Sequence, residues 1–403
     1  MIQSPVTLLR RLPRAVQLLV VGTFINRLGS FVLPFLTLVL HREFKLSETR
    51  SGWLVGAYGG GAIVSMLLGG FLTDRLGRRL TLMLSLFGSG SLAIAMGCAP
   101  SLRVFVPLLV AFAFVADLYR PAASAMIADL LPSADRAVGF AALRLAINLG
   151  FGAGVAVGGI LADLNWRLLF WGDGATTLAF GAMAFAVVKE SKAVPVPGAP
   201  PEEKGESPWR DGVFVKLVAS SFIFSVAFFM DLIVLPLTVT GSAGYPARVY
   251  GFLIATNGFL IAVLELTLVD WLKRFRRLRV AALGIGLTAV GMGMTGFVMH
   301  WAWFLAAVLL YTAGEILTIP QQSAFLADWS PPGQRGKYLG ISQASWGLGW
   351  AVAPLVFLPL HARLPETVFW LALGLATVPA ALLTLHLDRR ADHPELLRGR
   401  MSG

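Results

Sequence analysis

Twelve long apolar stretches, spread over the whole chain, constrain the fold more than any other feature of this 403-residue sequence. A membrane-spanning helix needs about 20 apolar residues to cross a hydrocarbon core of about 30 Å. Each stretch reaches that length. The stretches are 15–40, 51–73, 80–99, 104–131, 137–163, 167–188, 212–240, 248–271, 279–299, 301–329, 338–360 and 366–387. We therefore predict an all-α integral membrane protein with twelve transmembrane helices.

The composition excludes the main alternatives to a membrane protein. Hydrophobic residues make up 56% and charged residues 14% of the chain, whereas soluble domains carry about 25% charged residues. Such a chain has too little polar surface for a water-soluble globule and too little charge for intrinsic disorder. A single cysteine, Cys98, excludes a disulfide framework and a cysteine-based metal cluster. We expect no metal and no cofactor, since neither a metal-ligand motif nor a nucleotide-binding motif is present.

The net charge of +11 is interpreted as a topological signal. If both chain termini lie on the same side of the membrane, most lysine and arginine residues fall in the termini and polar gaps on that side. Positive charge in short loops marks the cytoplasmic side. We therefore expect a multi-pass protein of the inner, cytoplasmic membrane with both termini cytoplasmic and no nucleic-acid partner.

One polar gap is much longer than the others and divides the stretches into six and six. It runs from Lys189 to Arg210 and is rich in proline and charge, as linkers are. We predict an N-terminal six-helix bundle over 1–190, a cytoplasmic linker over 191–210 and a C-terminal six-helix bundle over 211–403.

The two predicted bundles repeat each other in sequence. Residues 121–136 and 320–335 are identical at seven of sixteen positions, and Val32-Leu33-Pro34 recurs as Val234-Leu235-Pro236. Six helices separate the repeats, so both run in the same direction through the membrane. Parallel repeats of this kind are a transporter architecture, with the substrate site at their interface.

The polar gap near residue 75 carries a family motif. It resembles the G-x-x-x-D-R-x-G-R-R signature of the major facilitator superfamily, whose positions are Gly70, Asp74, Arg75, Gly77, Arg78 and Arg79. The resemblance implies that this loop acts as a cytoplasmic latch between helices. Asp129 and Arg136, at the inner end of the fourth stretch, are close enough in topology to join it. The alternative is a solvated basic loop that only sets topology.

Within that superfamily, the chain looks like the MdtH/YajR-type drug:proton antiporters. Asn26-Arg27-Leu28-Gly29 with Pro34, and Gly314-Glu315 followed by Pro320, carry this narrower resemblance. Antiporters of the superfamily also carry a glycine motif in helix 5, matched here by Gly150, Gly154, Gly158 and Gly159. Val155 replaces the proline of that motif, so the direction of transport stays open. The glycines allow close helix packing.

Charged residues inside apolar stretches are candidate functional residues, because each costs at least about 2.5–3.5 kcal/mol to insert. With Asn26, the predicted substrate and proton pathway comprises Arg27, Asp117, Arg120, Asp231, Glu265 and Glu315. The resemblance places helices 1, 4, 7 and 10 around the central cavity. An equally good interpretation of Asp117 and Arg120 is a structural i, i+3 pair, and Glu265 is also a candidate partner of Lys273 or Arg274. Asp231 and Glu315, without a basic residue nearby in sequence, are the leading proton-coupling candidates.

These residues suggest three candidate functions. The first is a monomeric secondary transporter that exports amphipathic compounds or drugs in exchange for protons by alternating access. The second is a transporter of an anionic metabolite or lipid that uses the intramembrane arginines. The third, a membrane-embedded enzyme, lacks a nucleophile–base pair or a metal-ligand set within the membrane.

Overall fold

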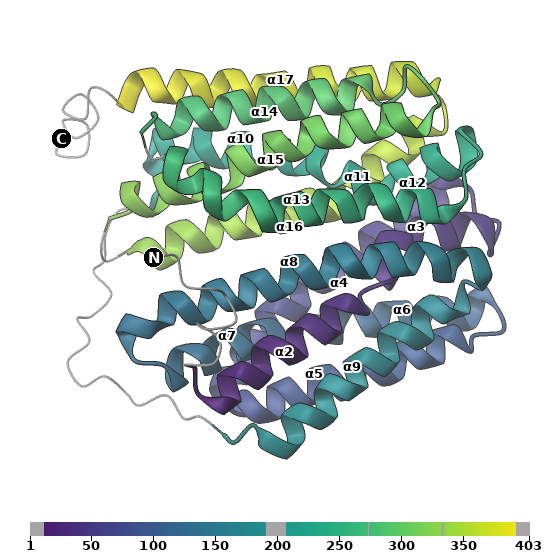
Figure 1. The fold of residues 1–403 in the computed structure, drawn as a ribbon, viewed down its shortest axis with the longest axis vertical. Helices are drawn as coiled ribbons and strands as arrows, with labels where there is room; N and C mark the ends of the chain where they lie inside the picture. Colours follow the sequence, from purple (N-terminus) through teal and green to yellow (C-terminus); the bar gives the residue numbers. More distant parts are fainter. Residues whose placement is uncertain (1–11, 191–206, 273, 332–333, 392–403) are drawn as a thin grey trace. The chain divides into compact units, whose positions relative to one another are not determined.

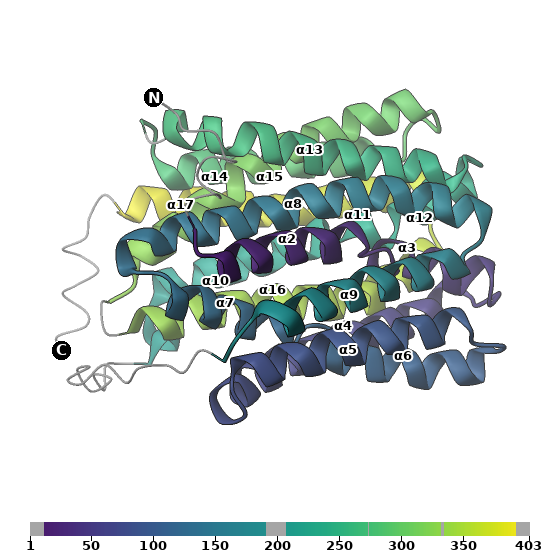
Figure 2. The ribbon, with the colours of Figure 1, turned by 60° about the horizontal axis from the view of Figure 1, so that its bottom comes forward.

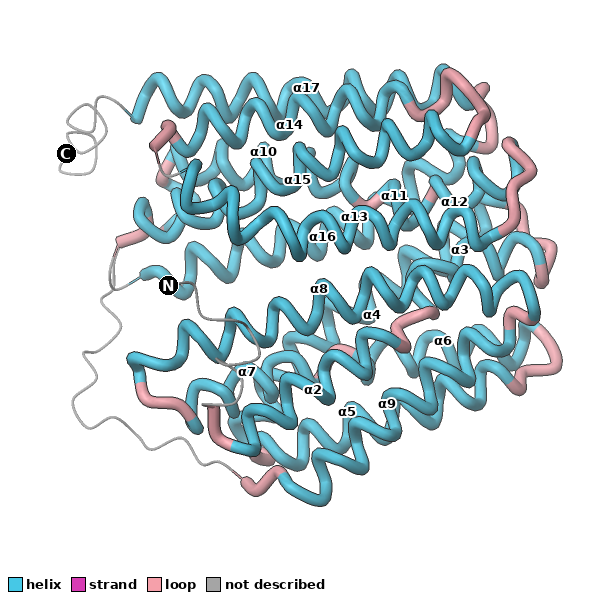
Figure 3. Tube along the Cα trace, in the orientation of Figure 1, coloured by secondary structure: helices cyan, strands magenta, loops and turns pink. Residues whose placement is uncertain are grey.

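The computed structural model describes residues 12–190, 207–272, 274–331 and 334–391 (Figure 1). Every regular element within these ranges is a helix, and short loops join the helices (Figure 3). Twelve helical segments are long and apolar enough to cross a membrane. The prediction of an all-helical protein with twelve membrane spans is confirmed.

The first six spans contain α2 (Arg14–Leu28), α3 (Val32–Arg42), α4 (Glu48–Arg75), α5 (Arg78–Gly97), α6 (Leu102–Ala116), α7 (Tyr119–Leu130), α8 (Ser133–Leu164) and α9 (Arg167–Val187). After a short helix, η1 (Pro208–Arg210), the last six contain α10 (Gly212–Phe228), α11 (Met230–Ile233), α12 (Leu235–Leu237), η2 (Thr238–Ser242), α13 (Ala247–Leu272), α14 (Arg277–Met294), α15 (Trp301–Trp329), α16 (Arg335–His361) and α17 (Glu366–Ala391). Spans 1, 4 and 7 are each built from more than one helix.

Polar side chains fix several helix starts at the ends of the spans. The Asp211 carboxylate accepts the N–H groups of Val213 and Phe214 at 3.0 and 3.1 Å, at the start of α10. Glu190 does the same for α5 from a distant part of the chain, accepting the N–H groups of Arg78 and Arg79 at 2.7 and 3.1 Å. Carboxylates are favourable here because the first N–H groups of a helix lack partners and carry partial positive charge.

Contacts divide the chain into two compact units. The first unit comprises residues 1–197, 232–262 and 354–359, and the second comprises 198–231, 263–353 and 360–403. Most of the predicted linker, 191–210, lies outside the described residues. The division into bundles over 1–190 and 211–403 stays a proposal from the sequence repeat.

In the first unit, α2 packs against both α8 and α9, and α5 packs against α9 (Figure 2). Fully buried Val16 and Leu19 of α2 meet Leu82 of α5 and Met126 of α7 in one apolar core. In the second unit, α14 packs against α15 and α17, and α10 packs against α17.

Glycines bring α8 close to its neighbours on two faces. A Cβ atom added at Gly150 or Gly154 would lie 2.7 or 2.6 Å from a backbone oxygen of α2, and one at Gly158 would meet Phe35 at 2.7 Å. On another face, a Cβ atom at Gly159 would lie 2.8 Å from the carbonyl oxygen of Ala247 in α13. The predicted packing glycines thus all lie at close helix contacts.

The end of α8 also caps α13. The Asp163 carboxylate accepts the backbone N–H groups of Ala247 and Arg248 at 2.7 and 3.2 Å, and the Arg248 guanidinium approaches it at 4.0 Å. This polar cap and the glycine contact connect span 5 directly to span 8.

Substitution Gly154→Ala should destabilise the protein by about 1–3 kcal/mol, because its methyl group would force α8 away from the α2 backbone. The matched control is Gly60→Ala in α4, where nothing lies within 4 Å of an added Cβ and alanine is the better helix former. Thermal unfolding in detergent checks this: a lower Tm is expected for Gly154→Ala only. Equal Tm values for the two variants would contradict the close contact.

Candidate functional site

Spans 1 and 7 break at equivalent positions, just before the repeated Val-Leu-Pro sequences. In span 1, α2 ends at Leu28 and α3 begins at Val32. In span 7, α10 ends at Phe228 and α12 begins at Leu235, with α11 between them. Breaks inside membrane helices are confined to places where protein groups or a water-filled cavity satisfy the freed backbone groups. Such breaks therefore indicate where a transport site could lie.

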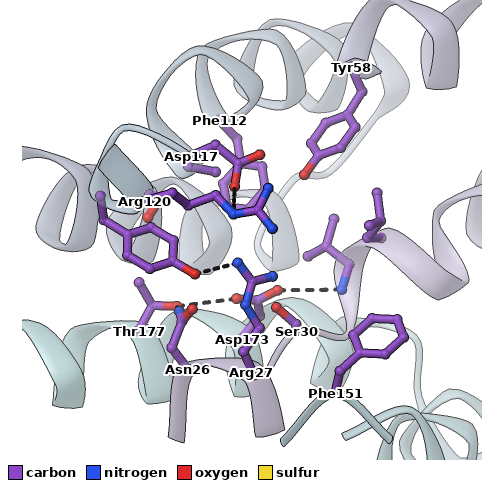
Figure 4. Close-up of a pocket in the computed structure, with 15 residues that line it drawn as sticks. Asn26, Arg27, Ser30, Tyr58, Phe112, Asp117, Arg120, Phe151, Asp173 and Thr177 are labelled. Carbon is purple, nitrogen blue, oxygen red and sulfur yellow. Dashed lines mark hydrogen bonds and ion pairs between the residues drawn. The ribbon is translucent and has the colours of Figure 1, made fainter. Parts of the chain in front are cut away.

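A polar cavity lies beside the break of span 1 in the first unit (Figure 4). It contains about 640 Å³ of empty space, part of it open. Predicted pathway residues from spans 1 and 4 meet there with side chains from spans 2 and 6. The lining includes Asn26, Arg27, Ser30, Tyr58, Asp117, Tyr119, Arg120, Asp173 and Thr177.

Arg27, in the last turn of α2, reaches across the cavity to span 4. One of its terminal nitrogens donates a hydrogen bond to the Tyr119 hydroxyl, and its guanidinium lies 5.6 Å from the centre of the Tyr119 ring. Its Nε atom is buried and has no hydrogen-bond partner among the residues that the structure describes. Arg27 therefore retains a donor for a further acceptor.

Asp117 and Arg120 lie at the break of span 4, between α6 and α7. The Arg120 Nε atom lies 3.5 Å from the Asp117 carboxylate, and 42% of the Arg120 side chain is exposed. This geometry matches the structural i, i+3 pair weighed from the sequence. It also leaves the rest of the Arg120 guanidinium facing open space, so the pair does not exclude a role in binding.

Asp173 in α9 is a further ionisable residue of this cavity and is not among the residues predicted from the sequence. Its carboxylate accepts the backbone N–H of Val32 at 3.4 Å and the Thr177 hydroxyl at 3.3 Å. Asn26 in turn donates to the Thr177 hydroxyl oxygen at 2.8 Å. Asp173 thus joins span 6 to both sides of the break in span 1. An acidic residue in the middle of the apolar stretch 167–188 was the signal that would have found it.

The predicted acidic residues Asp231 and Glu315 belong to the second unit. Asp231 is buried, with 4% of its surface exposed, and lies in α11 at the break of span 7. Glu315 is half-buried in α15. The side chain of Glu265 lies outside the part of the molecule that the structure describes.

The second unit has an uncharged cavity lined by both apolar and polar side chains, with an aromatic cluster beside it. Trp346 packs against Phe224, Phe228 and Phe229 with ring centres 5.5 to 6.1 Å apart, and Phe229 packs against Trp350 at 4.7 Å. Trp346 lines a cavity of about 730 Å³ of empty space, together with the polar groups of Ser221, Gln322, Gln343 and others. This chemistry differs from the charged cavity of the first unit.

Several residues of the predicted latch make contacts with neighbouring side chains or backbone. Arg78 forms an ion pair with Asp129 at 3.1 Å, and Arg79 donates to the carbonyl oxygen of Phe185 at 2.9 Å. Arg75 lies over the Phe71 ring at 4.5 Å. Gly77 has φ of 97°, a left-handed conformation that favours glycine, and Gly70 faces open space.

For two residues of the predicted latch, Asp74 and Arg136, the structure gives no contact with these side chains. Asp74 is exposed and makes no hydrogen bond or ion pair to any described residue. The side chain of Arg136 lies outside the described set. Among the described residues of the predicted latch, the ion pair joins Arg78 to Asp129 and does not involve Asp74.

Comparison with known proteins gives a consistent family assignment. The sequence model of the Major Facilitator Superfamily matches residues 19–318 and 217–400. An uncharacterised MFS-type transporter, YttB of Bacillus subtilis (strain 168), is 25% identical over 85% of this chain and 87% of its own. The Na(+), Li(+), K(+)/H(+) antiporter of Planococcus maritimus is 24% identical over 85% and 88%.

A drug-resistance protein and several solved structures are also similar. The quinolone resistance protein NorA of Staphylococcus aureus (strain MSSA476) is 21% identical over 91% of this chain and 94% of its own. The crystal structure of the peptide transporter POT in complex with sulfate superposes with a TM-score of 0.81 at 16% identity, covering 98% and 99% of the two chains. These structures share the fold with this chain.

For the latch, we predict that Asp74→Asn leaves stability within about 0.5 kcal/mol of the wild type, because Asp74 is exposed and unpaired among the described residues. Asp129→Asn should lower stability by about 1 kcal/mol through loss of the Arg78 pair. If Asp74 serves the latch in another conformation, Asp74→Asn slows transport without lowering stability. Thermal unfolding and transport rates are measured on both variants; normal turnover of Asp74→Asn would leave the loop with a topological role only.

Proposed function

Because the chain belongs to the major facilitator superfamily, we propose that this multi-pass membrane transporter exports small amphipathic organic molecules in exchange for protons. It acts by alternating access as a monomer in the inner membrane, with both termini cytoplasmic. The orientation is supported by the side on which lysine and arginine gather in the sequence.

The observation that carries the proposal is the group of ionisable residues at the helix breaks. Asp117 and Arg120 lie at the break of span 4, Asp173 lies at the break of span 1, and all three line one cavity. Asp231 lies at the break of span 7. Carboxyl groups inside the membrane are costly and are retained where they bind substrate or move protons. A transporter driven by a proton gradient needs such groups in its pathway.

The chemistry of the two units supports an amphipathic substrate. The cavity of the first unit offers hydrogen-bond donors and charges, and that of the second offers apolar side chains, the Trp346 ring, amides and hydroxyls. The charged groups suit the ionised or polar part of an amphipathic compound, and the apolar side chains suit its ring system. Two relatives are named for quinolone resistance and for cation/proton antiport, which is in line with proton-coupled export.

One observation favours a second candidate, transport of an anionic compound. Arg27 and Arg120 line the same cavity, and the Arg27 Nε atom and much of the Arg120 guanidinium are not used by described protein groups. Unused guanidinium donors suit carboxylate or phosphate oxygens. An acidic amphipathic compound would satisfy both candidates.

The test uses purified protein in liposomes with an imposed pH gradient and three probes: a fluorescent quinolone, ethidium as a cation, and an aromatic dicarboxylate. We expect the quinolone to be concentrated against its own gradient only when the pH gradient is present. Substitution Arg27→Gln should weaken transport of the dicarboxylate by about tenfold or more, the loss of one charge-assisted contact of about 1.5–3 kcal/mol, and should affect ethidium least.

Asp231 and Glu315 stay the proposed proton-coupling residues of the second unit. In Asp231→Asn, Glu315→Gln and the double variant, pH-driven accumulation of the quinolone should fall, whereas exchange down its own gradient continues. The coupling carboxyl must alternate between protonated and charged forms, which an amide cannot do. Wild-type accumulation by the double variant would remove both residues from the coupling step, and a wild type that ignores the pH gradient would contradict proton coupling as a whole.

A further inference from the structure

We propose that Asp173 of α9 carries a coupling proton in the first unit and, through its protonation, controls the break in span 1. This inference rests on the proposed proton coupling and extends it to a residue outside the family motifs discussed above. It is carried by the position of the carboxylate, its weak protein contacts and its access to the cavity.

Asp173 satisfies a backbone group that the break leaves open. The N–H of Val32, at the start of α3, has no helical partner and instead donates to the Asp173 carboxylate at 3.4 Å. The start of a helix also carries partial positive charge, which favours a negative group there. The charged form of Asp173 therefore holds α3 at the break.

The hydrogen bonds that the protein makes to this carboxylate are long. Those from the Val32 N–H and the Thr177 hydroxyl exceed the usual 2.7–3.2 Å range for such contacts, and the backbone N–H of Phe31 also faces the carboxylate. Of the described lysine, arginine and histidine side chains, none forms an ion pair with Asp173 within 4 Å. A carboxyl group that is buried to 94% yet lacks strong partners can exist in either protonation state, and the surrounding charges decide which is favoured.

Charged and titratable groups surround Asp173 from three other parts of the cavity wall. Span 1 contributes Arg27, whose charge attracts that of Asp173. Span 2 contributes Tyr58, and span 4 contributes Asp117, Tyr119 and Arg120. Arg120 is paired with Asp117, and Arg27 is hydrogen-bonded to Tyr119 (Figure 4). Any movement of span 1 that displaces Arg27 therefore changes the balance at Asp173.

The proton step is simple. A hydronium ion in the cavity gives its proton to a carboxylate oxygen of Asp173, forming one O–H bond and leaving water; in the other state of the transporter, the same bond breaks and the proton returns to water on the opposite side. The neutral carboxyl group attracts Arg27 and the start of α3 less strongly, so the break in span 1 is released. By linkage, movement of the break must change proton binding in return.

The decisive experiment records quinolone and proton movements together, in liposomes that enclose a pH-sensitive dye. Asp173→Asn keeps an oxygen that accepts the Val32 N–H but cannot carry a proton. We expect it to continue quinolone exchange without a pH gradient and to lose quinolone-driven proton movement and uphill accumulation. Asp173→Glu, which restores a titratable carboxyl group, should recover part of both.

The outcomes separate this inference from the proposed function. If wild-type protein moves no protons with quinolone, proton coupling fails and Asp173 has no coupling role. If the wild type is coupled and Asp173→Asn remains coupled, the inference alone is wrong. Loss of exchange as well as coupling in Asp173→Asn, with Asp173→Glu equally inactive, would mark a structural role and also overturn it.

A second pair of variants tests the inference without changing Asp173. Thr177→Val removes the hydroxyl that donates to the Asp173 carboxylate. Thr176→Val is the matched control, because among the described residues the Thr176 hydroxyl donates only to carbonyl oxygens of its own helix, those of Gly172 and Asp173. We expect the pH profile of proton-driven transport to move to higher pH in Thr177→Val and to stay unchanged in Thr176→Val. Unchanged profiles in both, or equal shifts in both, would overturn the assignment.

Discussion

A membrane helix that is interrupted inside the bilayer must have its freed backbone groups satisfied by the protein or by water in a cavity, and the architecture of the candidate site depends on this constraint. Span 1 is interrupted between Leu28 and Val32, and Asp173 accepts one of the N–H groups that the interruption exposes. The polar groups that satisfy the break are also those that line the cavity. Structure and candidate function therefore share the same residues.

Close helix packing places these groups. Gly150 and Gly154 allow the backbone of α8 to approach that of α2 immediately before the break. On the other side, α9 packs against α2 and carries Asp173 and Thr177 to the level of Asn26 and Val32. The break in span 1 thus lies between a close glycine contact with α8 and a polar contact with α9. Protonation can change the strength of the polar contact only, which is a suitable arrangement for a part that moves.

Much of the fold could be predicted from the sequence because span length and hydropathy are properties of single segments. The twelve spans needed no knowledge of tertiary contacts. The cap formed by Glu190 at the start of α5 could not be predicted, because more than one hundred residues separate Glu190 from Arg78. The break of span 1 could not be predicted either, since Gly29 and Pro34 are both tolerated in continuous membrane helices.

The candidate site was predicted in part. Arg27, Asp117 and Arg120 were found because charge inside an apolar stretch is unusual, and the structure brings all three into one cavity. Asp173 is also a charged residue inside an apolar stretch, but it was not predicted, because the stretch was interpreted only as a membrane span. Its role depends on a hydrogen bond to a backbone group 141 positions away, and no local pattern reports such a contact.

The proposed transport by alternating access uses the two bundles predicted from the sequence repeat, 1–190 and 211–403. Because span 5 belongs to one predicted bundle and span 8 to the other, this proposal requires the contact between them to open in each cycle. Cysteines in place of Asp163 and Arg248, in a background where Cys98 is replaced by serine, allow a short thiol cross-linker to join α8 to α13 at their polar cap. Each single-cysteine variant controls for loss of the cap. The account predicts that cross-linking abolishes quinolone transport in liposomes, and that reduction of a disulfide-containing linker restores it to the rate of the unlinked double variant. Transport at the unlinked rate while the two helices remain joined would contradict it.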